Sequence, residues 1–267
     1  MSDAKQWIIK LHKDGRGYST ITSVRNVIKP AFQMAYDEDI IRKNPFDFKL
    51  SDVIPNNTQK RVAMTNKEQK IWMDFIKNDK TYCKYYDEFV VLLQTGLRVS
   101  EFCGLTMSDI DFKKRTIKVD HQLIREATGK YYIEKTKTKN GVRYLPMTDD
   151  VYRSLKNIVN NRPKLKTEMI IDGYSRFILL DKNLNPKIAL HIENEMRWDM
   201  KKYKKLYPNV VLPHITPHVF RNTFCTNMAN AGMEVKTLQY LMGHSDVSVT
   251  LNVYTLLHHF IIIYVRI

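Results

Sequence analysis

The sequence contains little cysteine and no long apolar run. Its three cysteines are widely spaced and form no C-x-x-C pair. This usage argues against a disulfide framework and a cysteine-type zinc site, and it fits a reducing cytosol. No apolar stretch reaches the length of a bilayer span, and the first residues carry no apolar signal core. We therefore expect a cytoplasmic protein that has no membrane partner.

Acidic residues are scarce relative to basic ones. Aspartate and glutamate total 28 against 43 lysines and arginines, so the formal net charge is +15 and the pI is about 9.6. A surplus of this size favours a polyanionic partner, because cations placed near phosphates release condensed counterions. Charge alone also fits a generic basic surface or a ribosome-associated protein, so it favours nucleic acid without proving it.

The chain has 267 residues, enough for one large domain or up to two. Residues 1–50 have helical periodicity and predict a small, partial helical domain. Residues 51–63 are polar and contain a proline, which predicts a linker. A new helix then begins with Thr65 and Glu68, the spacing of a capping box.

Beyond the linker, helices alternate with a few strands. Runs at 116–120, 131–134 and 142–146 predict a three-strand antiparallel meander, with Thr-Gly and Asn-Gly turns between the strands. The periodicity predicts helices at 82–94, 149–161, 187–206, 217–231, 234–242 and 245–257. The expected fold class is mainly α with a small antiparallel β-sheet.

Two helix starts carry candidate anion-binding residues. Arg98 follows a Thr-Gly-Leu turn and lies near a positive helix N-terminus, and Glu101 is three residues further on. A Thr-Pro helix start places His218 and Arg221 one turn apart, a combination that suits a phosphate under attack. Taken alone, the first pair also fits a surface ion pair, and the second also fits a capped helix with a polar face.

A hairpin and the segment from a later helix end to the following helix add four further candidates. Lys137 and Lys139 lie on the expected hairpin, from which a flexible ammonium can reach a phosphate and donate a proton. His244 follows a helix-ending glycine, and Tyr254 lies toward the end of the next helix. Alone, the lysines fit a solvated basic hairpin, and Tyr254 fits a core tyrosine.

The four segments together narrow the interpretation. In chain order they supply Arg98, Lys137, His218, Arg221, His244 and Tyr254. This order resembles the tyrosine recombinase (phage integrase) family over about residues 64–257, most closely the integrases of conjugative transposons and phages of Gram-positive bacteria. The resemblance implies a catalytic domain at 64–257, preceded by a partial DNA-binding (core-binding) domain at 1–50. Residues 258–267 would then be an atypical tail.

The resemblance implies a role for each residue. Tyr254 would be the nucleophile that forms a 3′-phosphotyrosyl link. Arg98 and Arg221 would clamp the non-bridging oxygens and stabilise the charge of the transition state.

Proton transfer and support fall to the remaining residues. By resemblance, His218 would be a general base or hydrogen-bond partner, and His244 would donate to a non-bridging oxygen. Lys137 would be the general acid, with Lys139 as its rival, and Glu101 would be a supporting acidic residue.

The implied function is a site-specific DNA recombinase in the integration or excision of a mobile element, such as a transposon or phage. We expect no cofactor and no metal, because the arginines supply the positive charge. The expected partners are double-stranded DNA, a homotetramer assembled on it and an excision accessory factor. Three alternatives stand beside this function. They are a truncated, catalytically impaired relative that only occupies recombination sites, a topoisomerase-like relaxer, and a basic RNA-associated helical protein.

Overall fold

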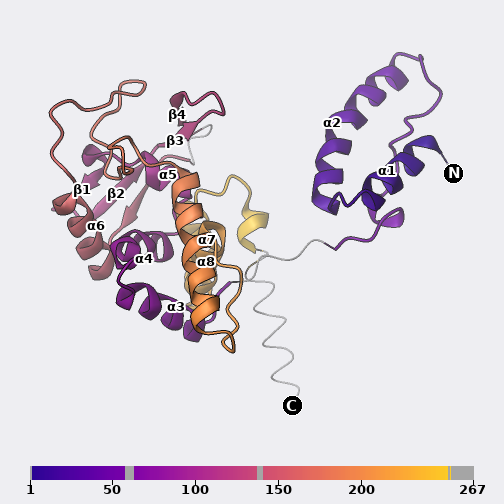
Figure 1. Ribbon diagram of the computed structural model, residues 1–267. Coiled ribbons are helices and arrows are strands. Elements are labelled where there is room, and N and C mark those ends of the chain that lie inside the picture. Colours follow the sequence, from indigo (N-terminus) through magenta and orange to yellow (C-terminus); the bar gives the residue numbers. More distant parts are fainter. Residues whose placement is uncertain (1, 58–62, 137–140, 252, 254–267) are drawn as a thin grey trace. The chain divides into compact units, whose positions relative to one another are not determined.

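The computed structural model describes residues 2–57, 63–136, 141–251 and 253 (Figure 1). The chain divides into two compact units, an N-terminal unit of residues 1–60 and a C-terminal unit of residues 61–267. In the part of the chain that is described, no helix combines the length and apolar character needed to cross a membrane.

The N-terminal unit is a small helical structure. Its elements are α1 (Asp3–Lys13), α2 (Tyr18–Asp37) and the 3-10 helix η1 (Leu50–Asp52). Ile8 and Ile21 from the two helices pack with Leu50 and Ile54 to form its core. The stretch expected as a linker at 51–63 therefore starts later in the structure, because Ile54 is buried among the helices.

The C-terminal unit begins with helices that form one wall of its core. They are α3 (Asn66–Asn78), η2 (Cys83–Tyr85), α4 (Tyr86–Thr95), α5 (Val99–Gly104) and η3 (Met107–Asp109). The capping box of Thr65 and Glu68 is confirmed at the start of α3. The helix expected at 82–94 begins later, since the Asp79 carboxylate accepts from the backbone N–H groups of Thr81 and Tyr82 and holds a turn there.

The strands of the described residues form two small antiparallel sheets. They are β1 (Ile110–Asp111), β2 (Thr116–Val119), β3 (His121–Arg125), β4 (Tyr131–Lys135) and β5 (Arg143–Pro146). One sheet has the order β1-β2-β5, and the other pairs β3 with β4. The mainly α fold class with small antiparallel sheets is confirmed.

The predicted meander is wrong in its pairing. β4 pairs with β3, a strand that the prediction lacked, while β5 pairs with β2. In β3 the buried His121 and Leu123 alternate with more exposed neighbours, an alternation that the polar histidine obscures in the sequence. The Thr-Gly turn does connect β3 to β4. Asn140 of the second turn lies outside the described residues.

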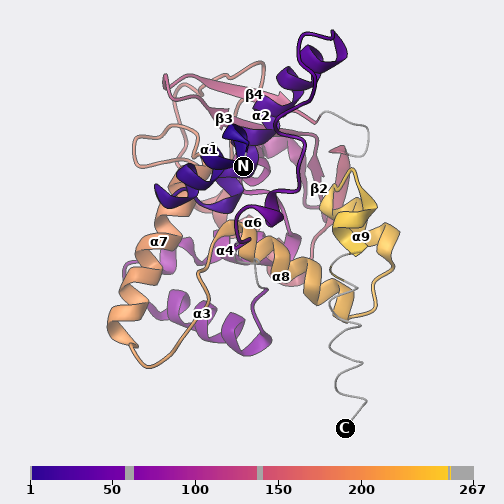
Figure 2. The same cartoon turned by 90° about the vertical axis from the view of Figure 1, so that its right-hand side faces the viewer.

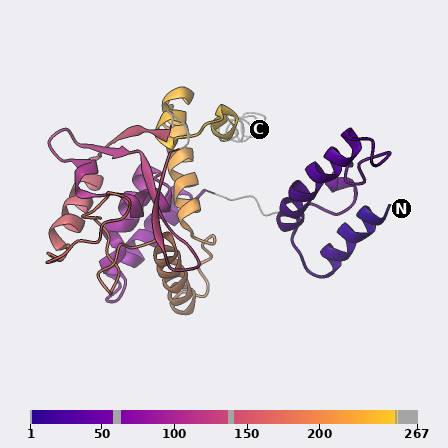
Figure 3. The same cartoon turned by 90° about the horizontal axis from the view of Figure 1, so that it is seen from above.

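Four further helices follow in the described part of the C-terminal unit, close to their predicted bounds. They are α6 (Asp149–Asn161), α7 (Ala189–Leu206), α8 (Pro217–Asn230) and α9 (Val235–Met242). Residues 247–251 and 253 are also helical. Within this unit, α7 and α9 lie on opposite sides with α8 between them (Figure 2). Helix α9 lies beside β5 (Figure 3). Two segments that are far apart in the sequence are thereby brought into contact.

Candidate active site

The C-terminal end of helix α9 gathers three arginines. Its last carbonyl oxygens accept hydrogen bonds as follows: Leu241 from Arg143 Nε at 2.8 Å, Met242 from Arg221 Nη2, and Gly243 from Arg98 Nη2 at 3.2 Å. Carbonyls at a helix end lack intrahelical donors and carry the negative end of the dipole, so cations are stabilised there. The three guanidiniums come from α8, β5 and the start of α5, so this helix end organises residues that are far apart in the sequence.

Glu101 links two of these arginines from a buried position on α5. Its carboxylate accepts from Arg143 Nη1 at 3.1 Å and Nη2 at 2.7 Å, and from Arg98 Nη1 at 2.8 Å. It also accepts from the backbone N–H of Arg98 at 2.8 Å. Burial alone would raise the pKa of Glu101, but the hydrogen bonds and charge of Arg143, followed by the charges of Arg98 and Arg221, lower it to about 2. Glu101 is therefore ionised throughout the physiological range.

Arg98 is the exposed member of the cluster. Its side chain retains 40% exposure, whereas that of Glu101 retains 4%. Arg98 lines a hollow of about 290 Å³ together with Gly243, Ser245 and residues of β3, β4 and the segment that follows β4. An anion that enters this hollow therefore meets the Arg98 guanidinium, already oriented by Glu101 and the Gly243 carbonyl.

Arg221 is held by backbone carbonyls at the end of α9 and at the end of α4. It is buried, and Nη1 donates to the Gly96 carbonyl at 2.5 Å while Nη2 donates to Met242. Gly96 caps α4 with φ of +64°, and a Cβ on it would lie 2.4 Å from Phe224. Burial and then the charge of Arg98 lower the pKa of Arg221, which still carries its charge at neutral pH. A glycine is thus required where this arginine is anchored.

His218 begins the helix that carries Arg221. Thr216 caps α8 by accepting from Val219 N at 3.3 Å, and Pro217 is the first helical residue. His218 is exposed in the first turn, and Arg221 lies one turn further on with its guanidinium directed inward. The expected spacing is present, and the exposed imidazole is accessible to a substrate.

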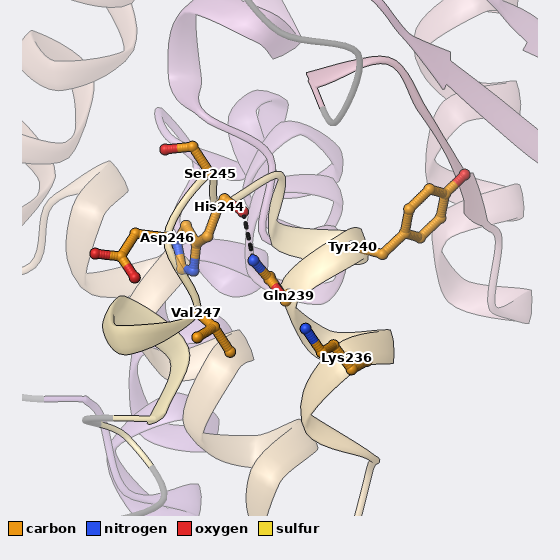
Figure 4. Close-up of a pocket in the computed structure, with 7 residues that line it drawn as sticks. All are labelled: Lys236, Gln239, Tyr240, His244, Ser245, Asp246 and Val247. Carbon is orange, nitrogen blue, oxygen red and sulfur yellow. Dashed lines mark hydrogen bonds between the residues drawn. The ribbon is translucent and has the colours of Figure 1, made fainter.

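His244 lies directly after the arginine-bearing helix end. Its backbone N–H donates to Gln239 O at 3.2 Å, and its carbonyl accepts from Gln239 Nε2 at 3.1 Å (Figure 4). Its Nδ1 lies 3.0 Å from Thr250 Oγ1. Burial and then the charges of Arg221 and Arg98 lower the pKa of His244 to about 4. The ring is therefore neutral at pH 7, and when Thr250 donates to Nδ1, Nε2 carries the hydrogen and can donate.

The structure brings together Arg98, Glu101, Arg221 and His244 around one helix end. Lys137, its rival Lys139 and Tyr254 lie outside the described residues. Sequence reasoning missed Arg143, which is completely buried. Its alternation with Leu145 along β5 placed it on the inward face, and that was the available signal.

One group of potential metal ligands occurs in the described residues. The ligand atoms of Asp109, Asp120 and His121 lie within 4.8 Å of one another. His121 Nδ1 is 2.6 Å from Asp120, Nε2 is 2.8 Å from the Gly104 carbonyl, and Asp109 accepts from Thr106. These atoms already have partners within the protein, so the group is best described as a hydrogen-bonded cluster.

Clamped arginines beside a neutral histidine form a site suited to binding an oxyanion. Residues 63–259 match the family model described as the phage integrase family. The match covers well over half of the chain, and the chain belongs to this family, the tyrosine recombinases. The resemblance inferred from the motifs is thereby confirmed.

The similar proteins include transposon proteins and Xer-type tyrosine recombinases. The chain is 46% identical over 253 residues to the transposase from transposon Tn916 of Enterococcus faecalis, which covers 95% of this chain and 62% of that protein. It is 29% identical over 263 residues to a XerC-like tyrosine recombinase of Caldanaerobacter subterraneus, with coverage of 92% and 64%. The chain thus spans somewhat under two thirds of the length of these curated relatives.

Solved structures of integrases and recombinases have a similar fold. The Tn1549 transposon integrase in complex with transposon right end DNA matches with a TM-score of 0.90 and 45% identity, over 94% of this chain and 79% of that one. The XerA recombinase crystal structure matches with a TM-score of 0.55 and 20% identity, over 95% and 76%, which shows a shared fold.

Proposed function

We propose that this protein is the integrase of a mobile element, a site-specific recombinase that cuts and rejoins duplex DNA through Tyr254. The main support is the helix end at which Arg98 and Arg221 are both held by backbone carbonyls, with His244 next in the chain. Relatives over almost the whole chain are transposon integrases and transposases, one of them solved on transposon-end DNA.

The charges of the site suit a phosphodiester that gains negative charge in the transition state. Arg98 and Arg221 would bind the non-bridging oxygens, and both are oriented before the substrate arrives. His244 is neutral, so it would act as a hydrogen-bond donor through Nε2. Preorganised donors of this kind stabilise the transition state without reorganising during the reaction.

The strand-transfer step would exchange one phosphoester bond for another. The Tyr254 hydroxyl oxygen would attack phosphorus, the bond between phosphorus and the 5′-oxygen would break, and a 3′-phosphotyrosyl link would form. His218 would accept the tyrosine proton, and Lys137, or its rival Lys139, would give a proton to the leaving 5′-oxygen. Reversal of the same step on a new 5′-hydroxyl would rejoin the strand, so no energy-rich cofactor is consumed.

The domain roles form part of the same proposal. The helical unit that includes the buried Ile54 would be the core-binding domain, and the polar stretch after it, up to residue 63, the linker. Residues 64–257 would be the catalytic domain and 258–267 an atypical tail. Four protomers would assemble on two recombination sites, because exchange of two duplexes joins four strands. An accessory factor would favour excision. The net charge of +15 supports a DNA partner.

A nicked duplex that spans the end of the element tests the reaction. A nick near the cleavage point lets the short 5′-fragment leave, so the covalent protein–DNA adduct accumulates and is visible on a denaturing gel. We expect an adduct with the wild-type protein and none with Tyr254→Phe. Tyr207→Phe is the matched control, because Tyr207 lies just after α7 and stacks on Tyr203 away from the arginines.

The outcomes separate the competing functions. Tight DNA binding without an adduct would favour the impaired relative that only occupies recombination sites. Adduct formation on any duplex, with relaxation of supercoils, would favour the relaxer. An adduct that survives Tyr254→Phe would assign the covalent link to another tyrosine, and Tyr240→Phe would be tested next.

A further inference from the structure

Arg143 connects the parts of the candidate active site without being exposed itself. Its side chain has 0% exposure, and its guanidinium forms two hydrogen bonds to Glu101. Nε donates to Leu241 O at 2.8 Å, and Nη1 lies 3.4 Å from Gly141 O. Every one of these partners belongs to the protein, so Arg143 has no surface with which to touch DNA.

The size of the local positive charge depends on Arg143. Arg98, Arg143 and Arg221 carry three positive charges against the single negative charge of Glu101, which leaves a surplus of two. A phosphodiester uses that surplus. Without Arg143 the surplus falls to one. Arg98 then remains as the arginine hydrogen-bonded to the Glu101 carboxylate, which competes with the phosphate for it.

The geometry of Arg98 depends on Arg143 as well. Arg98 has two side-chain anchors, the Glu101 carboxylate and the Gly243 carbonyl. Arg143 holds the first directly and the second through Leu241, two residues before Gly243. Its guanidinium also packs so closely on Gly243 that a Cβ there would lie 2.8 Å from Nη1. The fork of an arginine, with several donors in one plane, is needed to hold both anchors together.

We propose that Arg143 is a positioning residue that neutralises Glu101 and fixes the end of α9, so that Arg98 is oriented and electrostatically free to hold the scissile phosphate. This inference rests on the proposed strand-transfer function, since that function supplies the phosphate. It assigns a role in the reaction to a side chain that touches neither the DNA nor the reacting atoms.

The test compares variants that separate charge from geometry. Arg143→Met removes both, Arg143→Lys keeps the charge without the fork, and Arg143→Met combined with Glu101→Gln removes the competing carboxylate. Arg162→Met is the matched control, because Arg162 also donates to a backbone carbonyl, that of Phe177, and pairs with Glu168. Each protein is checked for folding by thermal unfolding.

The main readout is the rate of adduct formation on the nicked duplex at saturating protein. We expect Arg143→Met to slow it by about 100-fold, as for the loss of one preorganised donor. The double variant should recover about tenfold of this, because Arg98 no longer faces an uncompensated carboxylate. Arg143→Lys should lie between, and Arg162→Met should match the wild type. A double variant as slow as Arg143→Met would overturn the proposal, since a purely structural role predicts no recovery.

A second readout does not require cleavage. The affinity for the intact duplex is measured against salt, where each neutralised phosphate contributes a slope of about −0.9. Arg143→Met should make the slope shallower by about 0.9, the contribution of one neutralised phosphate. The double variant should restore the wild-type slope. If the wild type forms no adduct, the strand-transfer function fails, yet these slopes still decide the role of Arg143. Equal slopes for wild type and Arg143→Met would count against it, and if Arg143→Met does not fold, Arg143→Lys takes its place in both measurements.

Discussion

Two buried charge clusters in the C-terminal unit are built from similar groups with opposite balance. In the first, three arginines surround Glu101 at the end of α9. In the second, Lys187 pairs with Glu88 and with Glu195, at 2.7 Å in each case, and Asp199 lies next to them on α7. The first has a surplus of positive charge, and the second has a surplus of negative charge.

The two clusters also differ in access to a ligand. Arg98 borders an open hollow, so a phosphate can complete the first cluster. Asp199 has 0% exposure, and neither of its carboxylate oxygens has a hydrogen-bond partner among the described residues. Burial and then the charge of Glu195 raise the pKa of Asp199 to about 8, and burial raises that of Glu195 to about 7.

The comparison indicates how each imbalance is resolved. A buried charge without a partner is costly, so it is either compensated by an incoming charge or neutralised by a proton. The arginine cluster retains its charge because guanidiniums do not lose protons at neutral pH, and that charge is available to a substrate. The carboxylate cluster instead takes up a proton. Only the first arrangement is suited to binding an anion.

The largest expected effect comes from removing a clamp of the first cluster. Arg221→Lys keeps the charge but cannot donate in one plane to both Gly96 and Met242. We expect adduct formation to slow by about 10²- to 10³-fold, with a change in DNA affinity of less than about tenfold, because transition-state charge is affected more than binding. Single-turnover cleavage and fluorescence anisotropy measure the two quantities. Equal losses in both would mean that Arg221 serves ground-state binding only.

The parts that could be predicted from the sequence are those encoded locally. The helix starts at Thr65 and Thr216, and the glycine-terminated helix before His244, depend on residues a few positions apart. The two charge clusters depend on contacts between distant segments. Arg143 meets Leu241 across 98 positions, and Lys187 meets Glu88 across 99. No local pattern encodes such a pair.

The β-sheets failed as predictions for a related reason. Strand periodicity marked β2, β4 and β5, but the partner of each strand is set by packing. The buried His121 is the first residue of β3 and bonds Asp120 and the Gly104 carbonyl, and β3 pairs with β4. A residue type that is more often exposed therefore begins a core strand, and hydrophobic pattern alone passes over it.

The second expected effect is a change in the free energy of unfolding that depends on Asp199 in the carboxylate cluster. Asp199 has a pKa of about 8 in the fold, above its ordinary value of 3.8. The folded protein thus holds a proton that the unfolded chain releases, so the free energy of unfolding falls as pH rises from about 4 to 8. Asp199→Asn mimics the protonated group. We expect it to stabilise the protein by about 1–3 kcal/mol at pH 8.5 and hardly at all at pH 5.

Urea unfolding at the two pH values measures this difference. Asp79→Asn is the matched control, because Asp79 accepts from Thr81 and Tyr82, pairs with Lys202 and has a lowered pKa. Its replacement should destabilise the protein at pH 8.5. Adduct formation should be unchanged in Asp199→Asn. An unfolding free energy that responds equally at both pH values would show that Asp199 is not the group that holds the proton.

The smallest expected effect tests whether charge or simple attachment matters at the end of α9. Besides Arg143, this helix is tied to β5 by the Tyr240 hydroxyl, which accepts from the backbone N–H of Tyr144 at 2.9 Å (Figure 4 shows the Tyr240 ring directed toward the strand). Both tyrosines are about half exposed, so water can replace the lost bond. Tyr240→Phe should cost about 0.5–1 kcal/mol in urea unfolding and change the cleavage rate by less than about twofold. If it slowed cleavage as much as Arg143→Met, the contact between α9 and β5 would be the important feature. The charge surplus that distinguishes the two clusters would then be incidental to the reaction.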